Sequence, residues 1–135
     1  MSALIGCGKK GFSISNNPPS SMMSGPSGLC LDERNGELFV ADTGNGVIRR
    51  VSSRKEAAPI GMPGDLRLVD GDLARARFAG PSTIRMCGGK VMAVDAGVVR
   101  AVDLDSGRVS TVYASSRKVV DMACGDGDVF VLEET

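Results

Sequence analysis

Acidic residues at matching places are the first candidates for chemistry in this 135-residue chain. Asp42 and Asp95 each close a similar apolar run, and Asp70 and Asp72 flank Gly71. Carboxylates can ligate a metal ion, but a calcium loop needs more oxygen ligands, in a fixed order, than this segment supplies. In turn sequences an aspartate commonly accepts backbone N–H bonds instead. We therefore expect these acids to stabilise turns, and we expect neither a metal nor a cofactor.

Catalytic groups are scarce. The chain has no histidine, which is the commonest general base and metal ligand in proteins. No nucleophile elbow, P-loop or dinucleotide fingerprint is present. The glycine-rich stretch at residues 6–11 lacks the Gly-Lys-Ser/Thr ending of a phosphate-binding loop. The sequence therefore predicts that the chain is not an enzyme.

Basic residues suggest a different chemistry, the binding of RNA. Arg49, Arg50, Arg54 and Lys55 lie close together, and Arg100 occupies a position matching Arg49 in a later unit. RNA-binding surfaces combine such cations with aromatic side chains on which bases stack. Aromatic residues make up only 4% of the chain, the formal net charge is zero, and Phe39 and Phe130 belong to apolar runs expected in the core. A solvated outer strand is the favoured interpretation of these cations, with RNA binding as the alternative.

The cysteines and the N-terminal residues indicate the cellular compartment in which the chain is expected. The four cysteines are widely spaced and form no CxxC pair, so we expect reduced, partly buried thiols and neither a zinc site nor a disulfide framework. Residues 1–10 contain only a short apolar run with no basic segment before it, and no run is long enough to span a membrane. These features predict a cytoplasmic protein without a membrane partner.

Internal repetition is the strongest feature of the sequence. Residues 36–42 (GELFVAD), 89–95 (GKVMAVD) and 127–133 (GDVFVLE) each contain a turn glycine, a polar residue, an apolar run and an acid. Further strand-like runs precede and follow the first two at similar spacing. The pattern predicts eleven short strands in four-stranded units, beginning with an outer strand at Ser2–Gly6. Repeated four-stranded units are typical of propeller blades, with a β-sandwich as the structural alternative.

The predicted organisation is one all-β segment. Residues 1–25 would supply the outer strand of a preceding blade and a connector, residues 26–80 and 81–118 a blade each, and residues 119–135 the start of a further blade. Pro59 cannot donate a ladder hydrogen bond, which suits an outer edge strand. Gly44 is expected to adopt a positive φ in its turn. Residues 71–78 could form a helical turn capped by Asp72.

Two stretches of the sequence resemble the NHL-repeat family. Residues 26–32 (PSGLCLD) and 36–49 (GELFVADTGNGVIR) match its pattern over more than twenty positions, and residues 70–82 are similar to its connector. The second unit lacks the Thr and Asn of the turn, Gly46 stands where many members have histidine, and the third unit has Glu133 in place of aspartate. The resemblance implies a propeller, usually of six blades, that binds protein or, in some members, RNA. A few relatives of the fold are metal-dependent lyases or lactonases.

The resemblance also directs attention to the loops. Fewer than three blades are present, whereas closed propellers have about four to eight. The chain would therefore be a piece of a larger ring, or copies of it would associate. Long connectors at residues 8–25 and 63–80 should share one face with the turns after the second strands, and binding residues concentrate on such loops. We expect a binding or scaffold module that contacts protein through this face; an RNA-binding segment and a propeller-enzyme remnant are the alternatives. The candidate residues are Asp42, Thr43, Asn45, Arg67, Asp70, Asp72, Arg75, Arg77 and Asp95.

Overall fold

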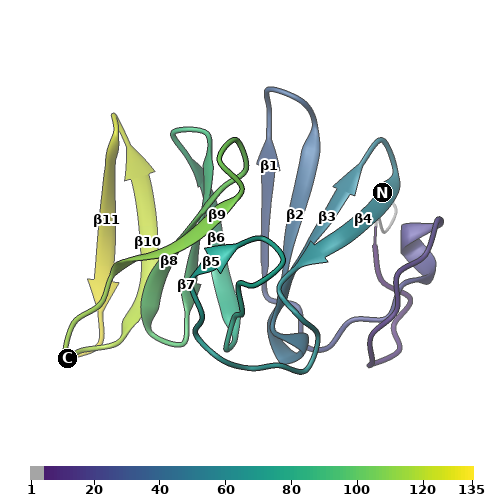
Figure 1. Cartoon of the computed structure of the whole chain (residues 1–135), viewed down its shortest axis with the longest axis horizontal. Coiled ribbons are helices and arrows are strands. Elements are labelled where there is room, and N and C mark those ends of the chain that lie inside the picture. Colours follow the sequence, from purple (N-terminus) through teal and green to yellow (C-terminus); the bar gives the residue numbers. More distant parts are fainter. Residues whose placement is uncertain (1–4) are drawn as a thin grey trace.

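Three antiparallel sheets follow one another along the chain in the computed structural model, which describes residues 5–135 (Figure 1). The first sheet has the order β1 (Gly28–Asp32), β2 (Glu37–Asp42), β3 (Val47–Ser52), β4 (Lys55–Ile60). The second has the order β5 (Gly71–Asp72), β9 (Arg108–Tyr113), β8 (Val98–Asp103), β7 (Lys90–Asp95), β6 (Pro81–Cys87). The third pairs β10 (Val119–Gly125) with β11 (Asp128–Glu133). Two short 3-10 turns, Pro18–Ser20 and Thr43–Asn45, complete the regular structure.

The sheets are arranged as blades. The inner strands are β1, β6 and β10, and β6 of the second sheet contacts both β1 and β10. Neighbouring strands are joined by tight turns, because glycine and Asx residues permit the backbone to reverse within a few positions. The chain is therefore an all-β partial propeller, as the repeats predicted.

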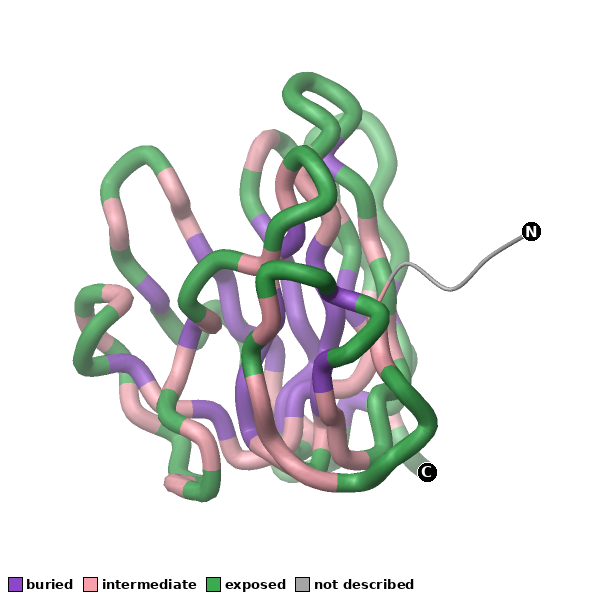
Figure 2. Tube along the Cα trace, turned by 90° about the vertical axis from the view of Figure 1, so that its right-hand side faces the viewer, coloured by how far each residue is buried: buried purple, intermediate pink, exposed green. Residues whose placement is uncertain are grey.

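Apolar side chains fill the spaces between the blades. One buried cluster joins Phe39, Ile48 and Ile60 of the first sheet to Ile84 and Val102 of the second. A smaller cluster joins the other face of the second sheet to the third. The buried residues accordingly gather along the central strands, and the turns are exposed (Figure 2). Phe130 differs from the prediction: its side chain is 61% exposed, because no element within residues 5–135 covers that face of the third sheet.

Some local features differ from the predicted strand pattern. The outer strand expected at Ser2–Gly6 lies mostly outside the described residues, and Ile5 and Gly6 are not in a strand. The eleventh strand is instead β5, which pairs with β9 of the second sheet although it lies in the segment assigned to the first unit. Pro59 does lie in an edge strand, where β4 breaks register with β3. Asp72 caps the turn that follows it, since its Oδ1 accepts the N–H groups of Ala74 and Arg75.

The turn after β2 corrects the expectation for Gly44. The left-handed backbone belongs to Gly46, with φ 68°, and not to Gly44. Gly44 is required for another reason: a Cβ atom there would lie 2.5 Å from Ser24 Oγ and 2.6 Å from Ser24 O. The glycine therefore permits close approach of the segment that leads into β1.

Replacing Gly44 with valine is expected to lower the free energy of unfolding by about 1–2 kcal/mol, because the branched side chain overlaps the backbone at Ser24. Chemical denaturation monitored by circular dichroism measures the change. A denaturation midpoint equal to that of the wild-type chain would contradict the close contact.

Candidate functional site

A buried ion-pair network ties the first blade to the segment before it. Arg49 in β3 is fully buried, and its guanidinium lies 2.8 Å from Asp42 and 2.7 Å from Glu56. It also donates hydrogen bonds to the carbonyl oxygens of Ser13 and Met22, and it stacks 4.4 Å from the ring centroid of Phe12. Arg49 therefore helps to fix the segment before β1, residues 5–27, which we call the first connector, to the first sheet.

Asp42 and Asn45 complete this network. One oxygen of Asp42 accepts the Ser24 N–H at 2.7 Å, and the other accepts the amide of Asn45 at 2.8 Å. The same amide donates to the Gly11 carbonyl at 2.8 Å, and the Thr43 hydroxyl donates to the Pro81 carbonyl at 2.7 Å. These three predicted site residues are thus occupied by contacts that hold the connectors in place.

The second blade repeats the arrangement. Arg100 in β8 is fully buried, 2.8 Å from Asp95 and 3.0 Å from Asp70, and it lies 4.9 Å from the ring centroid of Phe78. Asp95 accepts the Gly80 N–H at 2.7 Å. The guanidinium also donates to carbonyl oxygens of the second connector, residues 61–80. Each third-strand arginine therefore holds the connector that leads into its own blade.

This geometry overturns the solvated-strand interpretation for Arg49 and Arg100, which are both 0% exposed. Cation–carboxylate pairs and carbonyl acceptors offset part of the cost of burying these charges. A signal was present in the sequence: an acid ends the second strand and an arginine occupies the third in both complete units. Of the other cations in that group, Arg50 is 2.8 Å from Glu37. The sequence cluster of basic residues is therefore split between the interior and the surface.

The turns after β2 and β7 and the two connectors lie at the same end of the blades, which we call the loop face. The Ser24–Asp42 and Gly80–Asp95 hydrogen bonds fix this arrangement, and Gly64 N–H donates to Asn45 O at 3.0 Å. In Figure 1 the loop face is the lower edge of the molecule. The sequence-predicted candidates divide within it: Asp42 and Asp95 are fully buried, whereas Arg67 and Arg75 are 66% and 84% exposed.

Ion pairs also hold the exposed second connector. Asp65 pairs with Arg67 at 2.6 Å and with Arg77 at 3.0 Å. The hydrogen bond from Arg67 is the largest cause that lowers the pKa of Asp65 to about 2; partial desolvation opposes it and Arg77 reinforces it. The N–H and hydroxyl of Thr111 hold Asp70 against β9. The connector therefore presents its side chains from a fixed backbone.

Within residues 5–135, no group of three or more Cys, Asp or Glu side chains is arranged to hold a metal ion. The same part of the chain contains no helix long and apolar enough to cross a membrane.

Two of the cysteines correct the prediction of reduced thiols. Cys87, at the end of β6, and Cys124, in β10, form a disulfide with a Cα–Cα distance of 5.8 Å. The bond links the second and third blades. Cys7 is free and exposed, and Cys30 is free and half-buried. Burial is the main cause that raises the pKa of Cys30 to about 11.

The two free cysteines should therefore react with iodoacetamide at very different rates. A pKa of about 11 instead of 9.0 reduces the thiolate fraction about a hundredfold at pH 8, and the thiolate is the reactive species. We expect one rapid label on Cys7 and slow labelling of Cys30 in the folded chain, measured by peptide mapping without reductant. Equal rates for the two thiols in the folded chain would contradict the assigned environment of Cys30, and equal rates in urea serve as the control.

Comparison with known proteins agrees with the observed fold. The family model for the NHL repeat matches residues 23–50, which include β1, β2 and most of β3. No curated protein matches the chain significantly. A similar solved structure is a structural genomics protein of unknown function from Bacteroides thetaiotaomicron. Its sequence is 21% identical and its TM-score is 0.67 over 90% of this chain, which spans 34% of that protein's length. Residues 23–50 therefore match the NHL repeat, and the chain has the fold of a partial β-propeller.

Proposed function

We propose that the chain is a non-catalytic binding module that contacts a protein partner through the second connector on the loop face. The supporting observation is a set of exposed apolar side chains on a fixed backbone. Met62, Leu66 and Leu68 are 47%, 50% and 46% exposed. A loop that is already rigid loses little conformational entropy when it binds. Burial of its apolar side chains away from water then makes the free energy of binding more favourable.

The charged neighbours fit the same role. Arg67 lies between the two leucines, and Arg75 is exposed on the same connector. Arginine is enriched at protein interfaces, where it combines an apolar stem with a guanidinium that binds carboxylates. The expected partner surface is apolar at its centre and carries acidic residues at its rim. Arg77 is only 15% exposed and pairs with Asp65, and Asp70 pairs with Arg100, so these two candidates hold the connector in place.

A matched pair of double variants tests this proposal. L66S/L68S removes the exposed leucines of the connector, and L29S/L31S removes two leucines of β1 with exposed fractions of 61% and 50%. A protein captured from cell extract by the wild-type chain is purified and titrated against all three chains. We expect L66S/L68S to weaken binding at least about tenfold and L29S/L31S to leave it unchanged. Equal affinities for the three chains would overturn the assigned surface.

RNA binding by the same connector is the alternative function, and a second experiment distinguishes it from binding of a protein partner. Phosphate contacts by Arg67 and Arg75 would give an affinity that falls steeply with salt concentration. Retention of the chain on immobilised RNA at low salt, lost in R67M/R75M, would favour this alternative over a protein partner.

A further inference from the structure

The arginine network of the second blade reaches the surface, whereas that of the first blade does not. In the first blade the two acids that pair with the arginine are both 0% exposed. In the second blade Arg100 lies between Asp95, which is also 0% exposed, and Asp70, whose side chain is 49% exposed. One acid of the second network is therefore accessible, and it belongs to the second connector.

Thr111 holds this accessible acid against the outer strand of the second blade. One carboxylate oxygen of Asp70 accepts the Thr111 hydroxyl at 2.9 Å and the Arg100 guanidinium at 3.0 Å. The other oxygen accepts the Thr111 N–H at 3.0 Å. The matching stretch of β4 in the first blade, residues 57–59 (AAP), has no hydroxyl. We call the Asp70–Thr111 pair the latch, because it fastens the connector to β9 two residues after Leu68.

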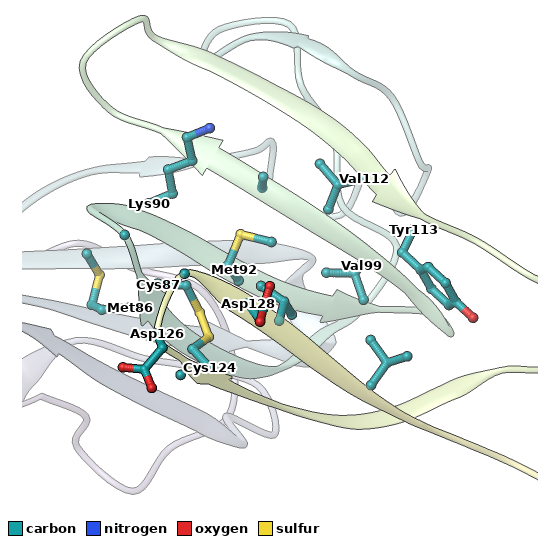
Figure 3. A pocket seen from close by; sticks show the side chains of 16 residues that line it. Met86, Cys87, Lys90, Met92, Val99, Val112, Tyr113, Cys124, Asp126 and Asp128 are labelled. Carbon is teal, nitrogen blue, oxygen red and sulfur yellow. A yellow bond between two sulfur atoms is a disulfide. The ribbon is translucent and has the colours of Figure 1, made fainter.

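Thr111 lies on the outer edge of β9, where it is exposed. The short strand β5 pairs only with Arg108 and Val109 of β9, and no other strand within residues 5–135 covers the outer edge. The next two residues, Val112 and Tyr113, line the cleft between the second and third blades (Figure 3). The Thr111 hydroxyl is directed instead to the second connector. An enzyme can therefore approach this hydroxyl on an extended stretch of backbone.

The residues before Thr111 suit a protein kinase that recognises a basic side chain. Arg108 lies three residues before Thr111 and is exposed, and kinases select substrates by such charge patterns. Ser52 and Ser53 also follow an arginine at this spacing. However, Ser52 is half-buried and follows Arg49, which is 0% exposed, and Ser53 lies in a tight turn with φ 50°. Of these three hydroxyls, Thr111 alone combines an exposed acceptor, an exposed arginine and an extended backbone.

A phosphate on Thr111 would oppose the latch directly. The network has one positive charge, on Arg100, and two negative charges, on Asp95 and Asp70. Partial burial opposes ionisation of Asp70, but hydrogen bonds from Thr111 and the charge of Arg100 lower its pKa, so it is charged at neutral pH. Phosphorylation adds a further charge of about −1.5 to −2 and removes the hydroxyl donor. Repulsion should therefore move Asp70 away from β9.

We propose that Thr111 is a phosphorylation site and that its modification opens the latch, which frees the second connector from the outer strand. The co-substrate is the magnesium complex of ATP, bound by a kinase that selects arginine three residues before the acceptor. Thr111 Oγ1 bonds to the γ-phosphorus as the bond to the β-phosphate oxygen breaks; the hydroxyl proton passes to the catalytic aspartate of the kinase, and ADP leaves. The effect on a partner rests on the proposed function, because a freed connector loses conformational entropy when it binds.

The first experiment locates the modification in the folded chain. The 135-residue chain is incubated with magnesium ATP and a recombinant kinase of this selectivity, and modified residues are identified by mass spectrometry of peptides. We expect Thr111 to be phosphorylated at least about tenfold faster than Ser52, and Arg108→Gln to slow the reaction at Thr111. Synthetic peptides copying residues 47–55 and 106–114 are the controls, and both should be phosphorylated. An unmodified Thr111 in the folded chain, when its peptide is a substrate, would overturn the site.

The second experiment measures whether the latch opens. Amide hydrogen exchange is compared between the phosphorylated and unmodified chains. We expect the amides of residues 64–70 and of Thr111 to exchange at least about tenfold faster after phosphorylation, with β2 and β3 unchanged. Asp70→Asn should reduce this difference, because a neutral amide is not repelled by phosphate, and the neighbouring change Ser110→Ala should leave it intact. Equal exchange in the two forms, or slower exchange because the phosphate replaces Asp70 at Arg100, would overturn the latch.

Partner binding separates a failure of this inference from a failure of the proposed function. The phosphorylated chain should bind the partner of the loop face at least about tenfold more weakly than the unmodified chain. Faster exchange with unchanged affinity would support the latch and contradict the second connector as the binding surface. Unchanged exchange would overturn the latch whatever the affinity.

Discussion

Replacing Arg49 with methionine is expected to lower the free energy of unfolding by about 3–5 kcal/mol. Methionine fills much of the same volume but carries no charge. Asp42 and Glu56, both 0% exposed in their pairs with Arg49, would then be buried without a cation. The carbonyl oxygens of Ser13 and Met22 would also lose their donor, so the first connector should detach from the blade. Urea denaturation followed by far-ultraviolet circular dichroism measures the change.

The control for this prediction is Arg67→Met on the second connector. Arg67 also pairs with an aspartate, but its side chain is 66% exposed, and pairs of this kind contribute about 0–1 kcal/mol. Both variants remove one positive charge from the chain, but the replaced arginine is buried in one variant and exposed in the other. Similar unfolding midpoints for both would show that the Arg49 network does not support the blade.

Replacing Gly28 with alanine is expected to destabilise the chain by about 3 kcal/mol, at the upper end of the usual cost of overpacking. A Cβ atom at Gly28 would lie 2.0 Å from the carbonyl oxygen of Ser82, and this atom belongs to the backbone of β6. The contact is relieved only if the inner strands β1 and β6 separate. That separation would open the apolar cluster between the first two blades, and thermal and urea denaturation would both detect it.

Gly125→Ala provides the matched control. Gly125 also lies in an inner strand, but the nearest atom to a Cβ there is Phe130 Cε2 at 4.0 Å. Alanine at this position should be neutral or stabilising by about 0.4–1 kcal/mol, because it restricts the unfolded chain. If both alanine variants unfold at the wild-type midpoint, the predicted overlap between a Cβ atom at position 28 and the backbone of β6 is contradicted.

Local sequence signals were sufficient to predict most of the strands. The repeated runs at residues 36–42, 89–95 and 127–133 became β2, β7 and β11, because alternation and turn residues act over a few positions. Pro59 was correctly placed in an edge strand because proline has no N–H to donate to a ladder. The short strand β5 was not predicted, since two residues carry no periodicity and its pairing with β9 is made across the fold.

The environments of particular side chains depended on partners far away in the sequence. Arg49 contacts the carbonyl of Ser13, and Cys87 bonds to Cys124, 37 residues later. Phe39 and Phe130 occupy the same place in similar runs, yet one is 0% and the other 61% exposed. The difference arises because burial depends on whether a neighbouring blade covers the residue, and the run itself contains no information about that blade.

The sequence by itself determined that this protein is a series of four-stranded repeats, because backbone preference and apolar alternation are local properties. Only the tertiary structure decided which charges are buried, which cysteines are joined and which apolar side chains face solvent. Those outcomes follow from the stacking of one blade on the next, where atoms from distant segments share a space from which water is excluded.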